Sequence, residues 1–242
     1  MSRQPMAIAM IAAVALLGAA SQAQGQWYVA VYLGGNHTQS STVSIDQPAD
    51  GVSLQFRNVE FEARPLSAPQ YYGYRVGRIF GSERRLGIEF EFIHLKAYAE
   101  TDRPYDVSGR AGVYGDGPLA PMNVVVSRYA MSHGLNFLLV NLTYRRPVSH
   151  GPMTIVARGG AGPTLPHAES TVGGVAREQY EFAGVGLHGA AGVDVKIHHW
   201  LSAVVEYKLT YAKPAITIAG GSGSMTAITN HLAVGLAFGL SR

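Results

Sequence analysis

Histidine and glutamate are the residues of this sequence best suited to chemistry, because imidazole titrates near neutral pH and both side chains ligate metals. The chain has nine histidines and no cysteine. A transition-metal site therefore has to be built from imidazole and carboxylate ligands, without thiolates. Five of the histidines fall at one end of the alternating segments described below: His37, His94, His133, His167 and His231.

Three of these histidines and one carboxylate form the candidate site: His133, His167, Glu169 and His231. If the chain path brings them to one height, they predict an acid–base centre or a divalent-metal centre, with the three histidines as metal ligands. The alternative is that histidine suits a polar membrane boundary, and that its recurrence there reflects composition and chance.

A serine hydrolase would need a Ser–His pair with an orienting acid. Ser132 and His133 are adjacent in the sequence. On a regular strand, adjacent side chains point to opposite faces and cannot pair directly. This spacing therefore disfavours a serine hydrolase.

The elements that must position these residues are eight segments of about ten residues with period-two polarity. Residues 85–95 are the clearest case, since Leu86, Ile88 and Phe90 alternate with Gly87, Glu89 and Glu91. The eight predicted strands are 27–36, 71–80, 85–95, 129–145, 153–162, 186–197, 200–211 and 228–238.

The connections between these strands alternate strictly between long and short. The long ones have 34, 33, 23 and 16 residues, and the short ones about 2 to 7. This rhythm is typical of an outer-membrane barrel, with short periplasmic turns and long outer loops. The sequence therefore predicts an all-β fold, an eight-stranded antiparallel up-and-down transmembrane β-barrel with both termini on the periplasmic side. It leaves open the conformation of the long loops 37–70 and 96–128.

The alternate strand positions that are expected to face the barrel interior carry equal numbers of charges, four cations and four anions. An eight-stranded barrel has an interior that side chains just fill. These charges are therefore expected to form ion pairs that plug the lumen, which disfavours a pore. They are Arg75, Glu89, Glu91, Arg158, Asp194, Lys196, Glu206 and Lys208.

Composition agrees with a membrane barrel, because 47% of residues are hydrophobic, only 14% are charged and 29 are glycine. A net charge of +3 with scattered basic residues gives no indication of nucleic-acid binding. Arg3, the apolar run 6–17 and the small residues Ser21 and Ala23 predict a secretory signal peptide. The predicted domains are this signal peptide, 1–23, and the barrel, 24–242.

The signal peptide, the eight segments and the aromatic-ended stretch His231-Leu-Ala-Val-Gly-Leu-Ala-Phe238 resemble the small outer-membrane β-barrel family of OmpA/OmpX type. This resemblance implies a monomeric integral outer-membrane protein in contact with lipopolysaccharide, inserted by the barrel-assembly machinery. Four residues follow Phe238, which departs from the terminal aromatic that the machinery recognises in that family.

Two further segments, Glu89-Phe-Glu-Phe-Ile-His-Leu95 and Ser132-His-Gly-Leu-Asn136, are similar to proteins identified as lipid A oxidase-like. Two functions are therefore compared below. The first is a surface or structural role for a barrel with a filled lumen. The alternative is an oxidase-like, metal-assisted enzyme that modifies lipid A with the histidine cluster at the outer rim.

Overall fold

The computed structural model describes residues 26–240, apart from 82, 116–118, 120 and 150. The predicted signal peptide lies outside the described residues. In the described part of the chain, no helix is long and apolar enough to cross a membrane.

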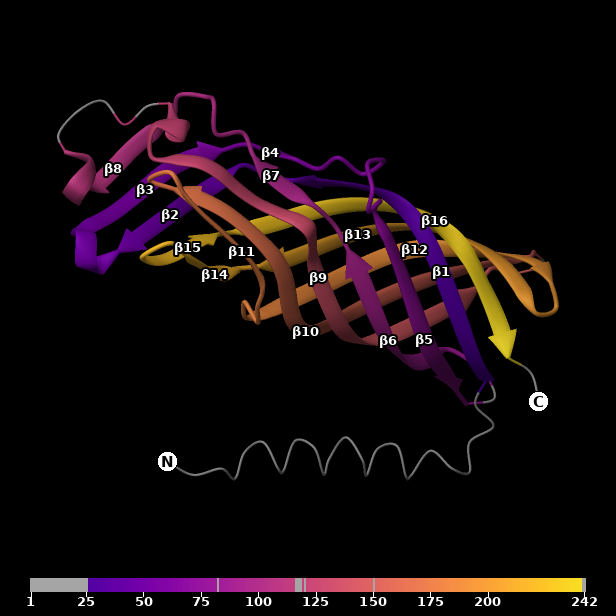
Figure 1. Cartoon of the computed structure of the whole chain (residues 1–242). Coiled ribbons are helices and arrows are strands. Elements are labelled where there is room, and N and C mark those ends of the chain that lie inside the picture. Colours follow the sequence, from indigo (N-terminus) through magenta and orange to yellow (C-terminus); the bar gives the residue numbers. More distant parts are fainter. Residues whose placement is uncertain (1–25, 82, 116–118, 120, 150, 241–242) are drawn as a thin grey trace, which may run out of the picture.

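Eight antiparallel strands form a closed barrel, as the sequence predicts (Figure 1). Consecutive barrel strands are neighbours, and β1 pairs with both β5 and β16, which closes the ring. The eight strands are β1 (Gln26–Thr38), β5 (Tyr72–Phe80), β6 (Leu86–His94), β9 (Val126–Pro147), β10 (Met153–Val172), β12 (Val185–His198), β13 (Leu201–Ala212) and β16 (Ala227–Leu240).

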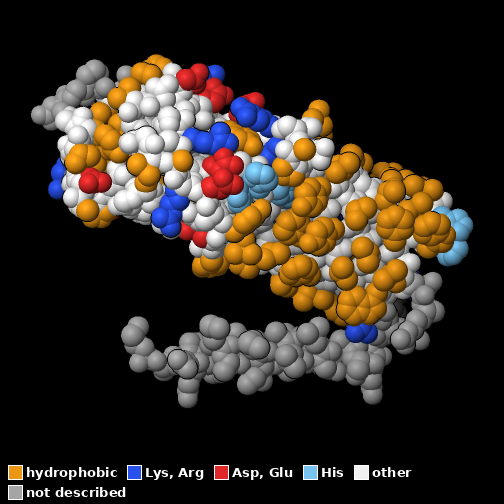
Figure 2. Space-filling model, viewed as in Figure 1, with side chains coloured by type: hydrophobic (Ala, Val, Ile, Leu, Met, Phe, Trp, Pro, Cys, Tyr) orange, Lys and Arg blue, Asp and Glu red, His pale blue; other side chains and the backbone are white. Residues whose placement is uncertain are grey.

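The barrel wall has an apolar outer face and a polar inner face because its strands alternate. Leu142 is 72% exposed on the outside, whereas Glu91, on the neighbouring strand, is fully buried inside. Figure 2 shows the resulting band of hydrophobic side chains on the visible face of the barrel, with most charged side chains confined to one end. Closure matters in such an apolar environment because an open sheet edge would leave backbone N–H and C=O groups without partners.

The long connections form a folded cap at that charged end. Five of their strands make a second sheet in the order β14-β15-β2-β3-β8. Its strands are β2 (Ser41–Gln47), β3 (Val52–Val59), β8 (Asp106–Arg110), β14 (Ala215–Ile218) and β15 (Gly221–Met225), with short 3-10 turns η2 (Pro48–Asp50), η3 (Gly112–Tyr114) and η4 (Met122–Val124). Buried apolar side chains of the cap such as Ile45, Phe56 and Met122 belong to one hydrophobic cluster that continues into the barrel at Phe137.

Two barrel strands extend well above the apolar band, further than the sequence predicts. β10 continues ten residues beyond the expected end at Gly162, because its ladder with β9 continues to Val172. β11 (Val175–Tyr180) pairs with this extension on one side. On the other side β9 pairs with β7 (Ala97–Ala99), which pairs with β4 (Phe61–Glu62).

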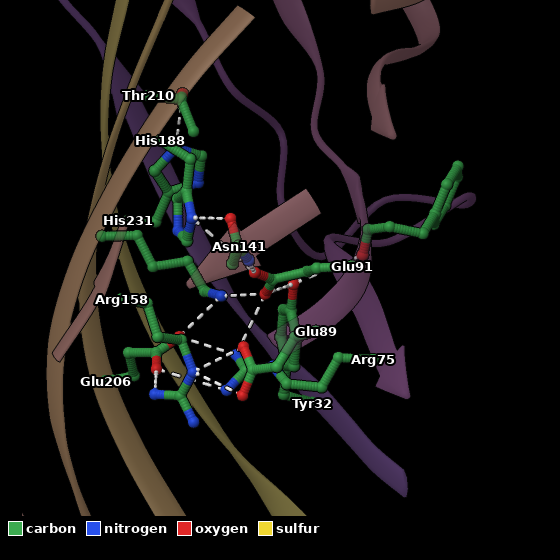
Figure 3. Close-up of polar contacts among 12 residues, drawn as sticks. Tyr32, Arg75, Glu89, Glu91, Asn141, Arg158, His188, Glu206, Thr210 and His231 are labelled. Carbon is green, nitrogen blue, oxygen red and sulfur yellow. Dashed lines mark hydrogen bonds and ion pairs between the residues drawn. The ribbon is translucent and has the colours of Figure 1, made fainter. Parts of the chain in front are cut away.

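Charged side chains fill the lumen (Figure 3). Glu206 accepts hydrogen bonds from Arg75 at 2.7 Å and from Lys208 at 2.6 Å, and it also contacts Arg158. Arg75 and Lys208 also contact Glu91, and Arg158 lies 3.0 Å from Glu89.

The remaining two of the eight charges predicted to fill the lumen lie elsewhere. Asp194 pairs with Arg145 at 2.8 Å. Lys196 is exposed and lines, with Asp194 and Arg145, the opening at the end of the barrel opposite the cap. Six charges therefore form the central network. Lys196 lies at the solvent-accessible opening opposite the cap because it is close to the end of β12.

Candidate rim site

A bulge in β9 shapes the outer face of the wall just above the apolar band. Leu135 pairs with Pro166 and Met131 with Ala168, so three residues of β9, 132–134, lie opposite the single residue His167 of β10. Gly134 has φ +104°, a conformation that side-chain-bearing residues rarely adopt. The extra length of β9 re-aims the side chains that precede Gly134.

Four potential metal ligands converge at this bulge. One ligand atom from each of His133, His167, Glu169 and Glu178 lies within 4.8 Å of all the others. His167 Nε2 is 3.0 Å from a carboxylate oxygen of Glu178, and His133 Nδ1 is 3.8 Å from one of Glu169. The two imidazole rings lie edge to face with their centroids 4.6 Å apart. We call these four residues the rim cluster.

Ser132 lies at the centre of the rim cluster, where sequence spacing did not place it. Its Oγ is 3.1 Å from Nδ1 of His133 and 3.2 Å from Nδ1 of His167, and it donates a hydrogen bond to Glu169. The expectation that Ser132 and His133 cannot approach each other is therefore wrong. It assumed a regular strand, and the bulge removes the strict alternation.

Arg128 fixes the charge state of Glu169 by pairing with its carboxylate. Burial disfavours ionisation of Glu169, but hydrogen bonds from Ser132 and Arg128 outweigh burial and hold the pKa of this carboxyl below its usual value. Glu169 therefore presents a carboxylate anion to the cluster.

The rim cluster faces outward and not into the lumen. On β10, His167 and Glu169 share the parity of Met153 and Ile155, which are exposed on the apolar band. The side chains of His133 and Glu178 are 52% and 60% exposed. Figure 2 shows histidine beside charged side chains where the apolar band meets the cap.

His231, by contrast, does not join the rim cluster. It is buried inside the barrel, where its Nε2 is 2.9 Å from Oγ of Thr210 and its Nδ1 is 3.1 Å from the hydroxyl of Tyr71 (Figure 3). The prediction that it shares a metal with His133 and His167 is corrected, because their side chains lie on opposite faces of the wall.

The other two histidines predicted at this end of the barrel also lie apart from the rim cluster. His37 is exposed and pairs with Asn230 across β1 and β16, on the side of the barrel opposite β9 and β10. His94 is buried, 2.8 Å from the amide oxygen of Asn136 and stacked on Tyr72. Height on the barrel alone therefore does not bring the five predicted histidines together.

Sequence reasoning missed Glu178, although a local signal for it exists. Gly173 and Gly174 both have positive φ and form a two-residue connection between Val172 and Val175. A Gly-Gly pair between alternating segments is typical of a β-hairpin. That hairpin sets the register in which Glu169 lies opposite Glu178.

Comparisons with known proteins agree with the architecture. Residues 6–238 match the sequence model of the family described as outer membrane protein beta-barrel domain. No curated protein matches the chain in sequence.

Similar solved structures include Neisserial surface protein A, with 10% identity over 88% of this chain and 96% of that one and a TM-score of 0.44. The N-terminal barrel of Pseudomonas aeruginosa OprF has 9% identity over 90% and 100% of the two chains and a TM-score of 0.41. The outer membrane protease OmpT from Escherichia coli has 8% identity over 89% and 97% and a TM-score of 0.47.

Proposed function

Because the chain belongs to the outer membrane protein beta-barrel family and is an integral outer-membrane protein, we propose that it modifies lipid A with metal assistance. The observation that carries this proposal is the convergence of His133, His167, Glu169 and Glu178 within 4.8 Å on the outward face. Two imidazoles and two carboxylates are a donor set that suits zinc and other divalent transition metals.

The arrangement needs only small rearrangements to bind such an ion. Ligand atoms about 2.1 Å from a tetrahedral metal lie roughly 3.4 Å from one another. The His133 and Glu178 side chains are largely exposed and have room to rotate toward His167 and Glu169. A divalent ion held by three of these four side chains would keep an open coordination position and would act as a Lewis acid on an oxygen of the substrate.

Ser132 has a positioning role in this proposal. Its hydroxyl contacts His133, His167 and Glu169, so it fixes the orientation of three ligands at once. Such contacts from outside the ligand set commonly tune metal sites.

The position of the rim cluster supports a lipid substrate. It lies directly above the apolar band, at the height where the headgroups of a bilayer meet its hydrocarbon. Tyr180 and Phe182, in and just after β11, are 64% and 63% exposed, and the Tyr180 ring contacts His167. A lipid can therefore keep its acyl chains against the band while its headgroup reaches the cluster.

Mass spectrometry of lipid A tests the proposal. Cells with the wild-type protein should contain a lipid A species that is absent from cells without it. His167→Ala and Glu178→Gln should abolish this species, while His37→Ala, which changes an exposed histidine outside the cluster, should preserve it. Identical lipid A in cells with and without the folded protein would refute the proposed enzymatic activity.

A surface or structural role without turnover is the second candidate, and the filled lumen favours it. Arg75, Glu91, Arg158, Glu206 and Lys208 are all essentially buried in the barrel interior. For this role, loss of the whole protein should lower the detergent resistance of cells, whereas His133→Ala with His167→Ala should leave that resistance unchanged. A loss of resistance in the double variant equal to that of the deletion would contradict it.

A further inference from the structure

A group of cations surrounds Tyr98 next to the rim cluster. The guanidinium carbons of Arg64 and Arg128 lie 4.4 Å and 5.8 Å from the centre of the Tyr98 ring, and Nζ of Lys96 lies 6.0 Å from it. The Tyr98 hydroxyl donates a hydrogen bond to the backbone carbonyl of Ser132. Tyr98 therefore links the three cations to Ser132, the residue at the centre of the cluster.

Strand register places this cationic group and the rim cluster on one face. Across neighbouring strands, Glu62 pairs with Tyr98, Tyr98 with Ala130, Ala130 with Glu169 and Glu169 with Glu178. Paired residues share a face of a sheet. This row of five residues therefore forms one outward-facing platform over β4, β7, β9, β10 and β11.

Both arginines next to the platform are paired with carboxylates, whereas Lys96 contacts none in the described part of the chain. Arg64 pairs with Glu62 at 2.6 Å, and Arg128 pairs with Glu169. Lys96 is 2% exposed, and its ammonium group donates to the carbonyl and hydroxyl oxygens of Ser67, each at 2.8 Å. Among the described residues, no carboxylate contacts that ammonium group. Burial, with a smaller contribution from Arg64, lowers the pKa of Lys96, as expected for a cation without a carboxylate partner.

Arg128 connects the cationic group to the rim cluster. It also lines a surface hollow of about 230 Å³ together with Glu169 and Glu178. If a divalent ion takes the Glu169 carboxylate, the Arg128 guanidinium loses its counterion and becomes available to a second anion. The side chains of Arg64 and Arg128 are 48% and 47% exposed, so a ligand can reach both.

We propose that Arg64 and Arg128 bind a phosphate monoester on the lipid headgroup, and that metal binding at the rim cluster strengthens this recognition. Guanidinium groups suit phosphate because they present several N–H donors in a planar fork. Lys96 contributes positive potential rather than contact, since Ser67 covers its ammonium group. The inference rests on the proposed function for its substrate, and it names a phosphorylated glycolipid as that substrate.

The test is binding, measured by native mass spectrometry of the full-chain protein in detergent. The probes are phosphorylated lipid A, the same lipid A after phosphatase treatment, and phosphatidic acid, each with zinc or with EDTA. Arg64→Gln and Arg128→Gln should each weaken binding of phosphorylated lipid A about tenfold. Arg110→Gln, in β8 of the cap, is the matched control and should bind like the wild type.

The wild type should prefer phosphorylated to dephosphorylated lipid A, and zinc should increase that preference. Stronger retention of lipid A than of phosphatidic acid would support the inference and identify the glycolipid as the source of the phosphate. Equal retention of both would support phosphate recognition alone. Equal binding of phosphorylated and dephosphorylated lipid A, or wild-type binding by both arginine variants, would overturn the inference.

These results are distinguishable from failure of the proposed function. Phosphate-dependent binding with unchanged lipid A in cells would refute the proposed enzymatic activity and support the phosphate-binding site. Altered lipid A in cells with phosphate-independent binding would support the enzymatic activity and refute the phosphate-binding site.

Discussion

Removal of one lumen carboxylate should destabilise the barrel strongly, and Glu206 is the most informative position. Its side chain is fully buried and contacts three cations, Arg75, Arg158 and Lys208. Glu206→Gln keeps the shape of the side chain but leaves these three cations with only Glu89 and Glu91. Breaking a buried ion pair by removing one partner costs about 3–5 kcal/mol, because the other charge stays buried without compensation. We expect a loss of that size in the free energy of unfolding.

Urea unfolding in phosphatidylcholine vesicles, followed by tryptophan fluorescence, measures this loss. Glu206→Gln combined with Arg158→Gln restores equal numbers of buried cations and anions, so the double variant should lose less stability than the two single variants added together. Glu83→Gln removes a carboxylate that is 71% exposed and pairs with Arg85, and it should change stability by less than about 1 kcal/mol. A loss below about 1 kcal/mol for Glu206→Gln would refute the reasoning, since it would mean that water compensates the lumen charges.

Three further predictions concern the outer wall, the lumen and the bulge. Val140→Arg, on the apolar band, should cost about 2–4 kcal/mol in the same unfolding assay, whereas Val113→Arg in the cap should cost little. The wild-type protein should show no channel steps in planar bilayers, and a steady conductance would contradict the filled lumen. Gly134→Ala should reduce zinc retention after dialysis at least about tenfold, because a methyl group there would overlap His94 and Asn136. Gly151→Ala, where nothing lies within 4 Å, should retain zinc like the wild type.

The barrel could be predicted from the sequence because a membrane imposes a simple rule on each strand. One face contacts hydrocarbon and the other faces the lumen, so side-chain polarity must alternate over the whole span. Leu86, Ile88 and Phe90 against Glu89 and Glu91 follow this rule. Six of the charges that this alternation placed on the inward face form the central network of the lumen.

The rim cluster could be predicted only in part, because side-chain polarity has to alternate only where a strand crosses the membrane. His133, His167 and Glu169 were recognised from their height on the barrel, but Ser132 depends on a bulge that no alternation pattern reveals. His231 was misassigned to the cluster because height alone says nothing about which face of the wall a side chain occupies. The cap sheet escaped prediction because two of its pairings, β3 with β8 and β15 with β2, join segments that are far apart in the sequence.

The small number of strands explains both the filled lumen and the outward position of the candidate site. Buried charged side chains fill the middle of this eight-stranded barrel, whereas His133 and Glu178 of the candidate site are exposed on the outside of the wall. The proposed function therefore places the chemistry on the outside of the wall, where a strand confined to the membrane offers mainly apolar residues. The extension of β9 and β10 above the band, widened by β4, β7 and β11, supplies a polar outward face beside the hydrocarbon. A membrane lipid, the substrate of the proposed function, can contact both surfaces at once without leaving the bilayer.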